Sequence, residues 1–259
     1  MEEINQTDNI KKTKKKRKLA IFDLYGTIAQ RPGDYFSIIR DVKKEIAENF
    51  GEISDTELSE IYTELIKALQ TRSTYLGKSV KLRNWTKIRL SNSLIERFKA
   101  NIAWVLIYDD VLEAIKYLQS KWYDIAVMSN LSKAYGAPLK NKKLFRHNPF
   151  KYKFLSYKLW FMKPDDKMFE YARKISWVDY DDMIMIGDSL KHDIEWAWKF
   201  WIKSIYVVRP KNQESDEQKT DENGNIVEYT YNETSTWTKY AQVSSLRKSI
   251  LEKLKEIIL

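Results

Sequence analysis

Three short apolar segments of this sequence are each followed, within two positions, by polar side chains that could do chemistry. These side chains are Asp23 after residues 19–22, Ser129 and Asn130 after residues 125–128, and Asp188 after residues 183–186. If the segments are strands of one parallel sheet, their carboxyl ends meet at the edge where such folds bind ligands. Lys163, in Lys163-Pro164-Asp165, adds an ammonium group from a loop. The sequence therefore predicts a cluster of two carboxylates, a hydroxyl, an amide and an ammonium group.

These groups indicate chemistry on a phosphate. Two carboxylates at close range raise each other's pKa, and a divalent cation between them relieves the repulsion. With oxygen ligands alone, the cation expected is Mg²⁺. The Lys163 ammonium and the Ser129 hydroxyl suit a dianionic phosphate. An aspartate such as Asp23 can accept a phosphoryl group and form an aspartyl-phosphate.

The segments around these residues predict the elements that must position them. Strands are expected at residues 19–22, 125–128, 183–186 and 204–208, and helices at residues 111–120, 169–175 and 190–200. Strands that alternate with helices imply an α/β fold with a doubly wound parallel sheet. Gly26 permits a sharp turn just after Asp23. Residues 34–105 carry only helical periodicity, which predicts an all-helical insert after the first strand.

Composition excludes other kinds of site. The chain has no cysteine and only two histidines, so it has no disulfide or thiolate metal site, and a zinc enzyme is not favoured. The absence of cysteine fits a reducing compartment, and we expect a cytoplasmic location. No apolar run approaches the length of a membrane span, so no membrane partner is expected.

The two ends of the chain differ from its centre in composition. Residues 1–18 hold seven lysine and arginine residues and three acidic ones, and so contribute +4 of the net charge of +9. They predict a disordered basic tail that solubilises the chain, with at most weak contact to nucleic acid. Residues 211–259 predict an extension with a hairpin at Asn223-Gly224 and an amphipathic helix over residues 244–258.

Four motifs in order give the chain a family resemblance. They are Asp23-Leu24-Tyr25-Gly26-Thr27, Ser129-Asn130, Lys163-Pro164-Asp165, and Gly187-Asp188-Ser189 followed by Asp193. The set resembles the haloacid dehalogenase-like (HAD) hydrolase superfamily over roughly residues 19–208. The resemblance implies a Rossmann-like core of residues 19–33 and 106–210, with residues 34–105 as a helical cap.

The resemblance also implies roles for individual residues. Asp23 would be the nucleophile. Mg²⁺ would be held by Asp23, the main-chain carbonyl of Tyr25 and Asp188. Thr27, Ser129 and Asn130 would bind the phosphoryl oxygens. Lys163 would neutralise charge on the nucleophile and the phosphate, and Asp193 would orient Lys163 or a metal-bound water.

The sequence departs from the phosphatases of this superfamily at Tyr25. Those enzymes carry a second aspartate there as general acid and base, and a tyrosine with a pKa near 10 cannot serve as the base at neutral pH. Asp-x-Tyr-Gly-Thr is instead typical of the 2-haloacid dehalogenase branch, which displaces halide without a metal. Gly187-Asp188-Ser189 is the metal-binding version of its motif, which that branch lacks.

We therefore expect a Mg²⁺-dependent phosphatase that acts on a small phosphorylated metabolite. A metal-independent 2-haloacid dehalogenase-like hydrolase and a HAD-fold binding or scaffold protein with little turnover are the alternatives. The sequence predicts neither the particular substrate nor the oligomeric state.

The tryptophans occupy positions at which glycine is expected. Trp122, Trp177 and Trp201 each follow a predicted helix, where a left-handed residue, usually glycine, ends the helix. The HAD pattern also expects glycine at Trp196 and tolerates it at Trp160. We therefore hypothesise that several of these residues are glycine in the native protein, encoded by UGA codons that have been translated as tryptophan.

Overall fold

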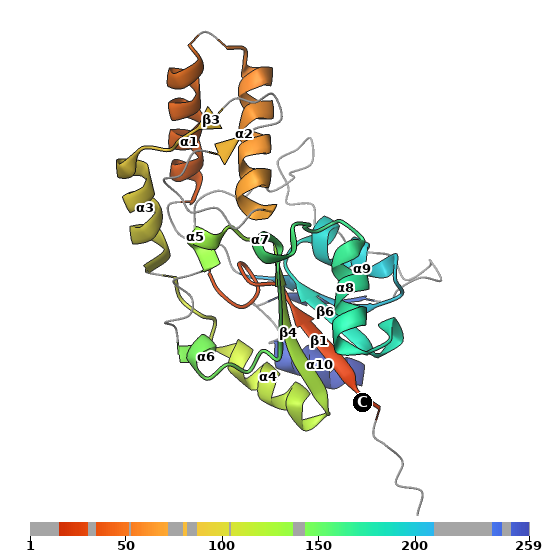
Figure 1. Ribbon diagram of the computed structural model, residues 1–259. Coiled ribbons are helices and arrows are strands. Elements are labelled where there is room, and N and C mark those ends of the chain that lie inside the picture. Colours follow the sequence, from red (N-terminus) through yellow and green to blue (C-terminus); the bar gives the residue numbers. More distant parts are fainter. Residues whose placement is uncertain are drawn as a thin grey trace, which may run out of the picture.

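A six-stranded sheet forms the centre of the fold (Figure 1). The computed structural model describes residues 16–30, 35–51, 53–71, 80–81, 87–103, 105–136, 143–209, 240–244 and 250–258. The strands of the sheet are β1 (Lys18–Phe22), β4 (Tyr123–Ser129), β5 (Tyr152–Leu155), β6 (Met183–Gly187), β7 (Lys203–Val208) and β8 (Tyr240–Ser244). They run in the order β5-β4-β1-β6-β7-β8, and every neighbouring pair is parallel. The predicted doubly wound parallel sheet is therefore confirmed.

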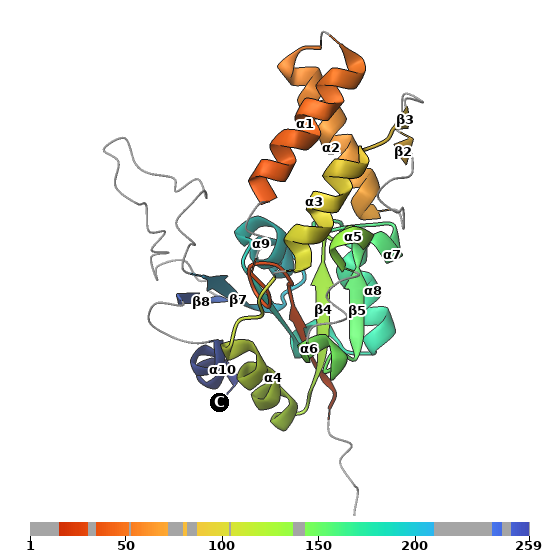
Figure 2. The ribbon, with the colours of Figure 1, turned by 90° about the vertical axis from the view of Figure 1, so that its left-hand side faces the viewer.

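The core also contains helices, which lie on both faces of this sheet and at the strand ends beside the cap (Figures 1 and 2). They are α4 (Asp110–Ser120), α5 (Lys133–Gly136), α6 (Lys143–Arg146), α7 (Ser156–Leu159), α8 (Lys167–Ser176), α9 (Glu195–Trp198) and α10 (Ile250–Ile258), with a 3₁₀ turn at Tyr180–Asp182 and a π-helical turn at Leu190–Ile194. The helix predicted over residues 190–200 is thus a π turn continued by the short α9. The sequence pattern did not predict β5, β8 or the three short helices α5, α6 and α7.

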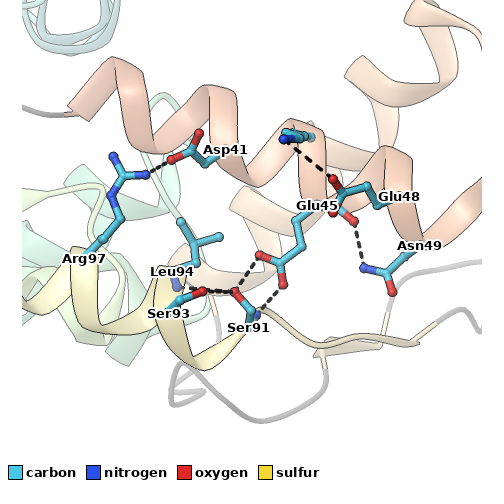
Figure 3. A pocket seen from close by; sticks show the side chains of 9 residues that line it. Asp41, Glu45, Glu48, Asn49, Ser91, Ser93, Leu94 and Arg97 are labelled. Atoms are coloured by element: carbon cyan, nitrogen blue, oxygen red, sulfur yellow. Dashed lines mark hydrogen bonds and ion pairs between the residues drawn. The ribbon is translucent and has the colours of Figure 1, made fainter.

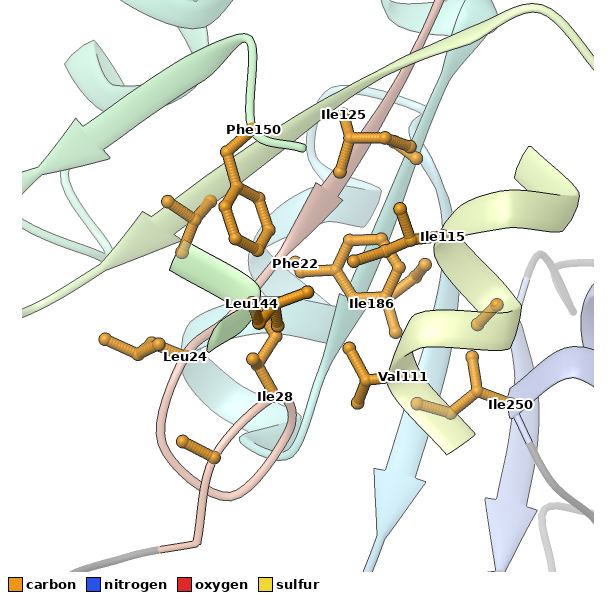
Figure 4. Close-up of a cluster of buried hydrophobic side chains, with 14 of the residues drawn as sticks. Phe22, Leu24, Ile28, Val111, Ile115, Ile125, Leu144, Phe150, Ile186 and Ile250 are labelled. Carbon is orange, nitrogen blue, oxygen red and sulfur yellow. The ribbon is translucent and has the colours of Figure 1, made fainter. Parts of the chain in front are cut away.

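The core divides into two clusters because successive side chains of a strand point to opposite faces. Phe22 packs with Ile115 of α4 and Ile250 of α10 on one face (Figure 4). Ile21 packs with Met168 of α8 and Trp196 of α9 on the other. Figure 2 shows the same division, with α4 and α10 on one side of the sheet and α8 on the other.

The insert between β1 and α4 has a hydrophobic core of its own. It comprises α1 (Tyr35–Phe50), α2 (Asp55–Thr71), β2 (Val80–Lys81), β3 (Lys87–Ile88) and α3 (Asn92–Ala103). Its buried centre includes Ile46, Leu65 and Leu94. The three helices agree with the predicted helical insert, but the expectation that it is all-helical is wrong. The two strands form a separate antiparallel pair of two residues each, which is too short to give an alternating pattern in the sequence.

The cap stands over the edge at which the central strands end (Figures 1 and 2). The chain leaves the core and returns to it side by side, because Gln30 donates its N–H to the Leu106 carbonyl and Tyr108 donates to the Ile28 carbonyl. A further bond joins the two parts where the Ser156 hydroxyl of α7 donates to the Gln70 carbonyl of α2 at 2.6 Å. The cap is therefore tied to the core beside the strand ends.

The segments at the two chain ends also contribute to the core. Lys18, the last residue of the predicted tail, begins β1, whereas residues 1–15 lie outside the described residues. The predicted hairpin around residue 224 also lies outside them. The predicted amphipathic helix corresponds to α10, which buries Ile250 and Leu254. Among the described residues, no helix is both long and apolar enough to span a membrane.

Candidate active site

The three central strands bring the predicted polar residues to one edge of the sheet. Asp23 follows β1, Ser129 ends β4 and Asp188 follows β6, and β1 lies between the other two. The Asp23 N–H donates to the Ile186 carbonyl at 2.8 Å, so the β1–β6 ladder continues to the aspartate itself. The strand order changes direction at β1, because β4 and β5 lie on one side of it and β6, β7 and β8 lie on the other. Parallel α/β sheets bind their ligands at such a point.

A buried lysine joins two of the carboxylates. Lys163, from the loop between α7 and α8, places its Nζ 2.5 Å from Asp23 Oδ1 and 2.5 Å from Asp193 Oδ1. All three residues are buried. Asp193 is itself fixed, because its Oδ2 accepts the Ser189 N–H at 3.0 Å. The predicted cluster of Asp23, Lys163 and Asp193 is thus formed.

Burial and neighbouring charges shift the pKa of both partners. Burial raises the pKa of Asp23 to about 7; Lys163 opposes this shift, and Asp193 and Asp188 add to it. Burial alone would lower the pKa of Lys163, but Asp193 and Asp23 together raise it. Lys163 is therefore held as an ammonium ion, and the Asp23 carboxylate is more readily protonated than that of an ordinary aspartate.

Three carboxylates at this edge could hold a metal ion. Oxygen atoms of Asp23, Asp188 and Asp193 all lie within 4.8 Å of one another. Lys163 contacts Asp23 and Asp193, and the three carboxylates together with this lysine carry a formal excess of two negative charges. This all-oxygen donor set fits a hard divalent cation such as Mg²⁺. Asp193 already accepts from Lys163 through Oδ1 and from the Ser189 N–H through Oδ2.

Two glycines make room for these carboxylates. A Cβ at Gly26 would lie 1.9 Å from Asp188 Oδ2, and Gly26 also has a φ of +93°, which disfavours any other residue. A Cβ at Gly187 would lie 2.3 Å from Asp193 Oδ2. The close packing of the acidic groups therefore requires glycine at both positions.

Asn130 contacts the lysine loop. Its Nδ2 donates to the Lys163 carbonyl and its Oδ1 accepts the Lys163 N–H, both at 2.7 Å. Both ends of the amide are thus used in orienting Lys163, whereas the sequence suggested an amide that binds substrate. Ser129 and Thr27 are both buried at the same edge, and Thr27 Oγ1 lies 3.5 Å from Asp188 Oδ1.

Tyr25 is held away from acid–base chemistry. Its hydroxyl donates to the Tyr135 carbonyl at 3.1 Å, and the two rings meet edge to face at 6.2 Å. Burial raises the pKa of Tyr25 above its ordinary value. The phenol therefore stays protonated and cannot act as a general base at neutral pH.

The match to a family model decides how this site is classified. A model described as haloacid dehalogenase-like hydrolase matches residues 20–207, and these residues carry Asp23, Ser129, Lys163 and Asp188. The chain belongs to the haloacid dehalogenase-like hydrolases. It is accordingly an enzyme of the phosphatase or dehalogenase type. No curated protein matches it in sequence.

Solved structures of HAD proteins share the fold. A HAD phosphatase from Thermococcus onnurineus is 18% identical with a TM-score of 0.55, over 93% of this chain and 97% of that one. A HAD family enzyme from Bacteroides thetaiotaomicron is 19% identical with a TM-score of 0.53, over 78% and 97%. A dehalogenase with intermediate complex is 17% identical with a TM-score of 0.53, over 94% and 98%. At these identities the likeness concerns the fold.

One residue of this HAD-like hydrolase that the sequence analysis missed is Arg209. Its guanidinium donates to the Thr27 carbonyl at 2.8 Å, pairs with Asp110 at 2.9 Å and lies 4.0 Å from the centre of the Tyr108 ring. It thus fixes the loop after Asp23 against the start of α4. The available signal was its place directly after the predicted strand 204–208, at the same sheet edge.

We expect Arg209→Lys to lower kcat/KM by about 10²-fold, because misplacing a catalytic loop by about 1 Å has an effect of that size. The planar guanidinium group of arginine bonds the Thr27 carbonyl and the Asp110 carboxylate at the same time. The ammonium group of a lysine cannot reproduce this geometry. The measurement is steady-state hydrolysis of the substrate used for the parent protein, with the melting temperature recorded alongside.

Arg173→Lys is the matched control, since Arg173 also pairs with an aspartate, Asp179 at 3.0 Å, and lies over a tyrosine ring, but on the surface. That variant should keep full activity. Equal losses in both variants would contradict a positioning role for Arg209.

A cavity of about 550 Å³ lies within the cap, away from the acidic cluster (Figure 3). Its walls come from α1 and from α3 with the residues just before it. The polar groups there join the two helices: Glu45 accepts from the Ser91 N–H and hydroxyl, and Arg97 pairs with Asp41. We therefore assign these residues to cap packing.

Proposed function

We propose that this HAD-like hydrolase is a Mg²⁺-dependent phosphatase that acts on a small phosphorylated metabolite through an aspartyl-phosphate. The observation that carries the proposal is the position of Asp188 beside Asp23 and Asp193. Three neighbouring carboxylates with one lysine repel one another unless a cation balances them. A metal-independent displacement at carbon gives no reason for the extra carboxylate.

In the proposed reaction, an oxygen of Asp23 attacks the phosphorus atom, the bond between phosphorus and the ester oxygen of the substrate breaks, and the leaving oxyanion takes a proton from water. Water then attacks the phosphorus atom and releases phosphate, which regenerates Asp23. Lys163, together with the buried Thr27 and Ser129 hydroxyls, supports the proposed binding of the phosphoryl oxygens. Asp23, the Tyr25 carbonyl and Asp188 would hold Mg²⁺, which neutralises charge on the transferring group.

Tyr25 limits the proposed substrates. It stands where the phosphatases of this family carry their general acid and base, and such catalysis contributes about 10²–10⁴-fold. Substrates whose leaving groups depart as weak bases, such as aryl or acyl phosphates, need this help least. A cap tied to the core beside the strand ends favours a small substrate enclosed from water.

The test is hydrolysis of p-nitrophenyl phosphate with and without Mg²⁺, in the parent protein and in Asp188→Asn. We expect hydrolysis only with the metal. Because the variant removes a proposed ligand, its half-maximal Mg²⁺ concentration should rise by about tenfold or more. Asp124→Asn, on a surface carboxylate paired with Lys151, serves as the control and should match the parent. Hydrolysis that is indifferent to both Mg²⁺ and Asp188→Asn would overturn the proposal.

A dehalogenase remains the second candidate because of Tyr25, which the chain shares with the Asp-x-Tyr-Gly-Thr pattern of that branch. A dehalogenase should release chloride from 2-chloropropionate without a metal, and this activity should not depend on Asp188. A scaffold protein predicts neither activity. Calorimetric titration with Mg²⁺, followed by beryllium fluoride, distinguishes it, because a phosphatase should bind both and a scaffold neither.

A further inference from the structure

Four tryptophans of this protein adopt a backbone conformation that large side chains avoid. Trp122, Trp160, Trp177 and Trp201 have φ angles of 67°, 70°, 58° and 60°. The other described residues with a left-handed φ are Gly26, Gly51 and Asn148, of the types that favour it. A bulky side chain at positive φ is a steric outlier.

Each of these tryptophans performs the backbone task that glycine usually performs at a helix end. The N–H groups of Trp122, Trp160, Trp177 and Trp201 donate to the carbonyls of Gln119, Ser156, Arg173 and Trp198, respectively, at 2.9 to 3.1 Å. Trp160 and Trp177 directly follow the last helical residue, Trp122 is the second residue after α4, and Trp201 is the third after α9. Bonds of this kind, made by a left-handed residue close after a helix, end many helices. The backbone at these four places is therefore that of a glycine stop.

Packing offers little compensation for the strained backbone. The four residues are 63%, 71%, 86% and 50% exposed, in chain order. Trp196 differs, since it is 2% exposed, stacks on Phe169 with ring centres 4.0 Å apart and donates its indole N–H to Asp166. No left-handed φ occurs at Trp196, so the conformational argument does not extend to it.

A shared binding surface does not account for the exposed indoles. Trp122 follows α4 on one face of the sheet, whereas Trp177 and Trp201 follow α8 and α9 on the other. These three precede strands, but Trp160 comes after β5 and so lies toward the opposite sheet edge. What the four have in common is their place at the end of a helix.

We infer that Trp122, Trp160, Trp177 and Trp201 are glycine in the native protein. The codon UGA is read as tryptophan in some genetic codes and as glycine in others, so the same gene can give either residue. The native chain then has glycine at four helix ends, where the strain of a left-handed φ disappears.

The first test determines the codons in the gene and the masses of peptides from the native protein. We expect UGA codons at all four positions, and peptides from the source organism with the masses of glycine-containing sequences. A UGG codon at any of the four overturns the inference for that position, and tryptophan-containing native peptides overturn it altogether.

The second test measures stability in the chain as printed. Each single change of these tryptophans to glycine should raise the melting temperature by about 2–4 °C. The four shifts should be nearly additive because the positions lie at the ends of four different helices. Replacement by alanine removes the same indole but keeps a Cβ at positive φ, so it should give no such gain.

Trp198→Gly is the control, because Trp198 is the last residue of α9 and has no left-handed φ. Glycine there should lower the melting temperature. If alanine stabilises the four positions as much as glycine does, backbone strain is not the cause and the inference loses its physical basis.

Discussion

Replacing Asp23 with asparagine should abolish phosphate hydrolysis and, at the same time, stabilise the metal-free protein at pH 8. We expect a loss of about 10⁴–10⁶-fold in kcat, the size seen when a nucleophile is removed. The gain in stability follows from the burial of the carboxylate, which raises its pKa to about 7 in the folded protein. Asparagine has nearly the same shape and carries no charge, so it removes the unfavourable burial of an anion.

The effect on stability depends on pH. The folded-state pKa of Asp23 lies above the value of 3.8 expected for the unfolded chain. Its contribution to stability is therefore fully present below about pH 4 and is lost as the pH rises through about 7. The difference in melting temperature between Asp23→Asn and the parent should be largest at pH 8 and shrink toward pH 5. Mg²⁺ should also reduce it, by stabilising the ionised parent.

Asp124→Asn provides the comparison, because Asp124 also pairs with a lysine, Lys151 at 2.6 Å, but at the surface. Exposed pairs contribute about 0–1 kcal/mol, so both activity and melting temperature should stay near the parent values. The melting temperatures are measured at several pH values, with and without Mg²⁺. An Asp23→Asn protein less stable than the parent at pH 8 would contradict the assigned cause of the pKa shift.

Replacing Lys163 with methionine should give the largest loss of stability. Lys163 contacts Asp23 and Asp193 inside the protein, so its removal leaves buried carboxylates without their partner. Breaking a buried ion pair in this way costs about 3–5 kcal/mol. The melting temperature should fall by about 10 °C or more at pH 8. Hydrolysis should also be lost.

Two comparisons isolate the ionic contribution. Lys151→Met, which breaks the exposed pair with Asp124, should change stability by about 1 kcal/mol or less. In the Asp23→Asn background, Lys163→Met should destabilise the protein less than in the parent, because one of the two carboxylates is already neutral. Equal losses in both backgrounds would mean that Lys163 acts by filling space.

The strand ends could be predicted from the sequence because an apolar segment and a following aspartate are local features. Asp23 and Asp188 were both placed in this way, and parallel pairing then implied that they meet. The place of Asp193 beside Lys163 was implied only by the family resemblance that the ordered motifs carry. The predicted helices over residues 111–120 and 169–175 agree closely with α4 and α8.

The remaining features depend on distant contacts. Arg209 bonds a carbonyl 182 positions away, and nothing in its local sequence indicates this partner. Asn130 turns its amide toward Lys163, whereas the motif alone suggested a substrate oxygen. β5 and β8 are short strands whose pairing with β4 and β7 decides their structure. Tertiary context of this kind overrides local pattern.

The position of α10 means that the unit recognised by sequence is smaller than the unit that folds. The family match ends at residue 207, yet Ile250 and Leu254 are fully buried against the α4 side of the sheet. β8 likewise pairs along β7, whose edge would otherwise be open. A chain cut just after Arg209 would keep every proposed catalytic group and the arginine that holds the loop after Asp23, and would still expose apolar core, so loss of activity on that truncation would reflect misfolding before chemistry.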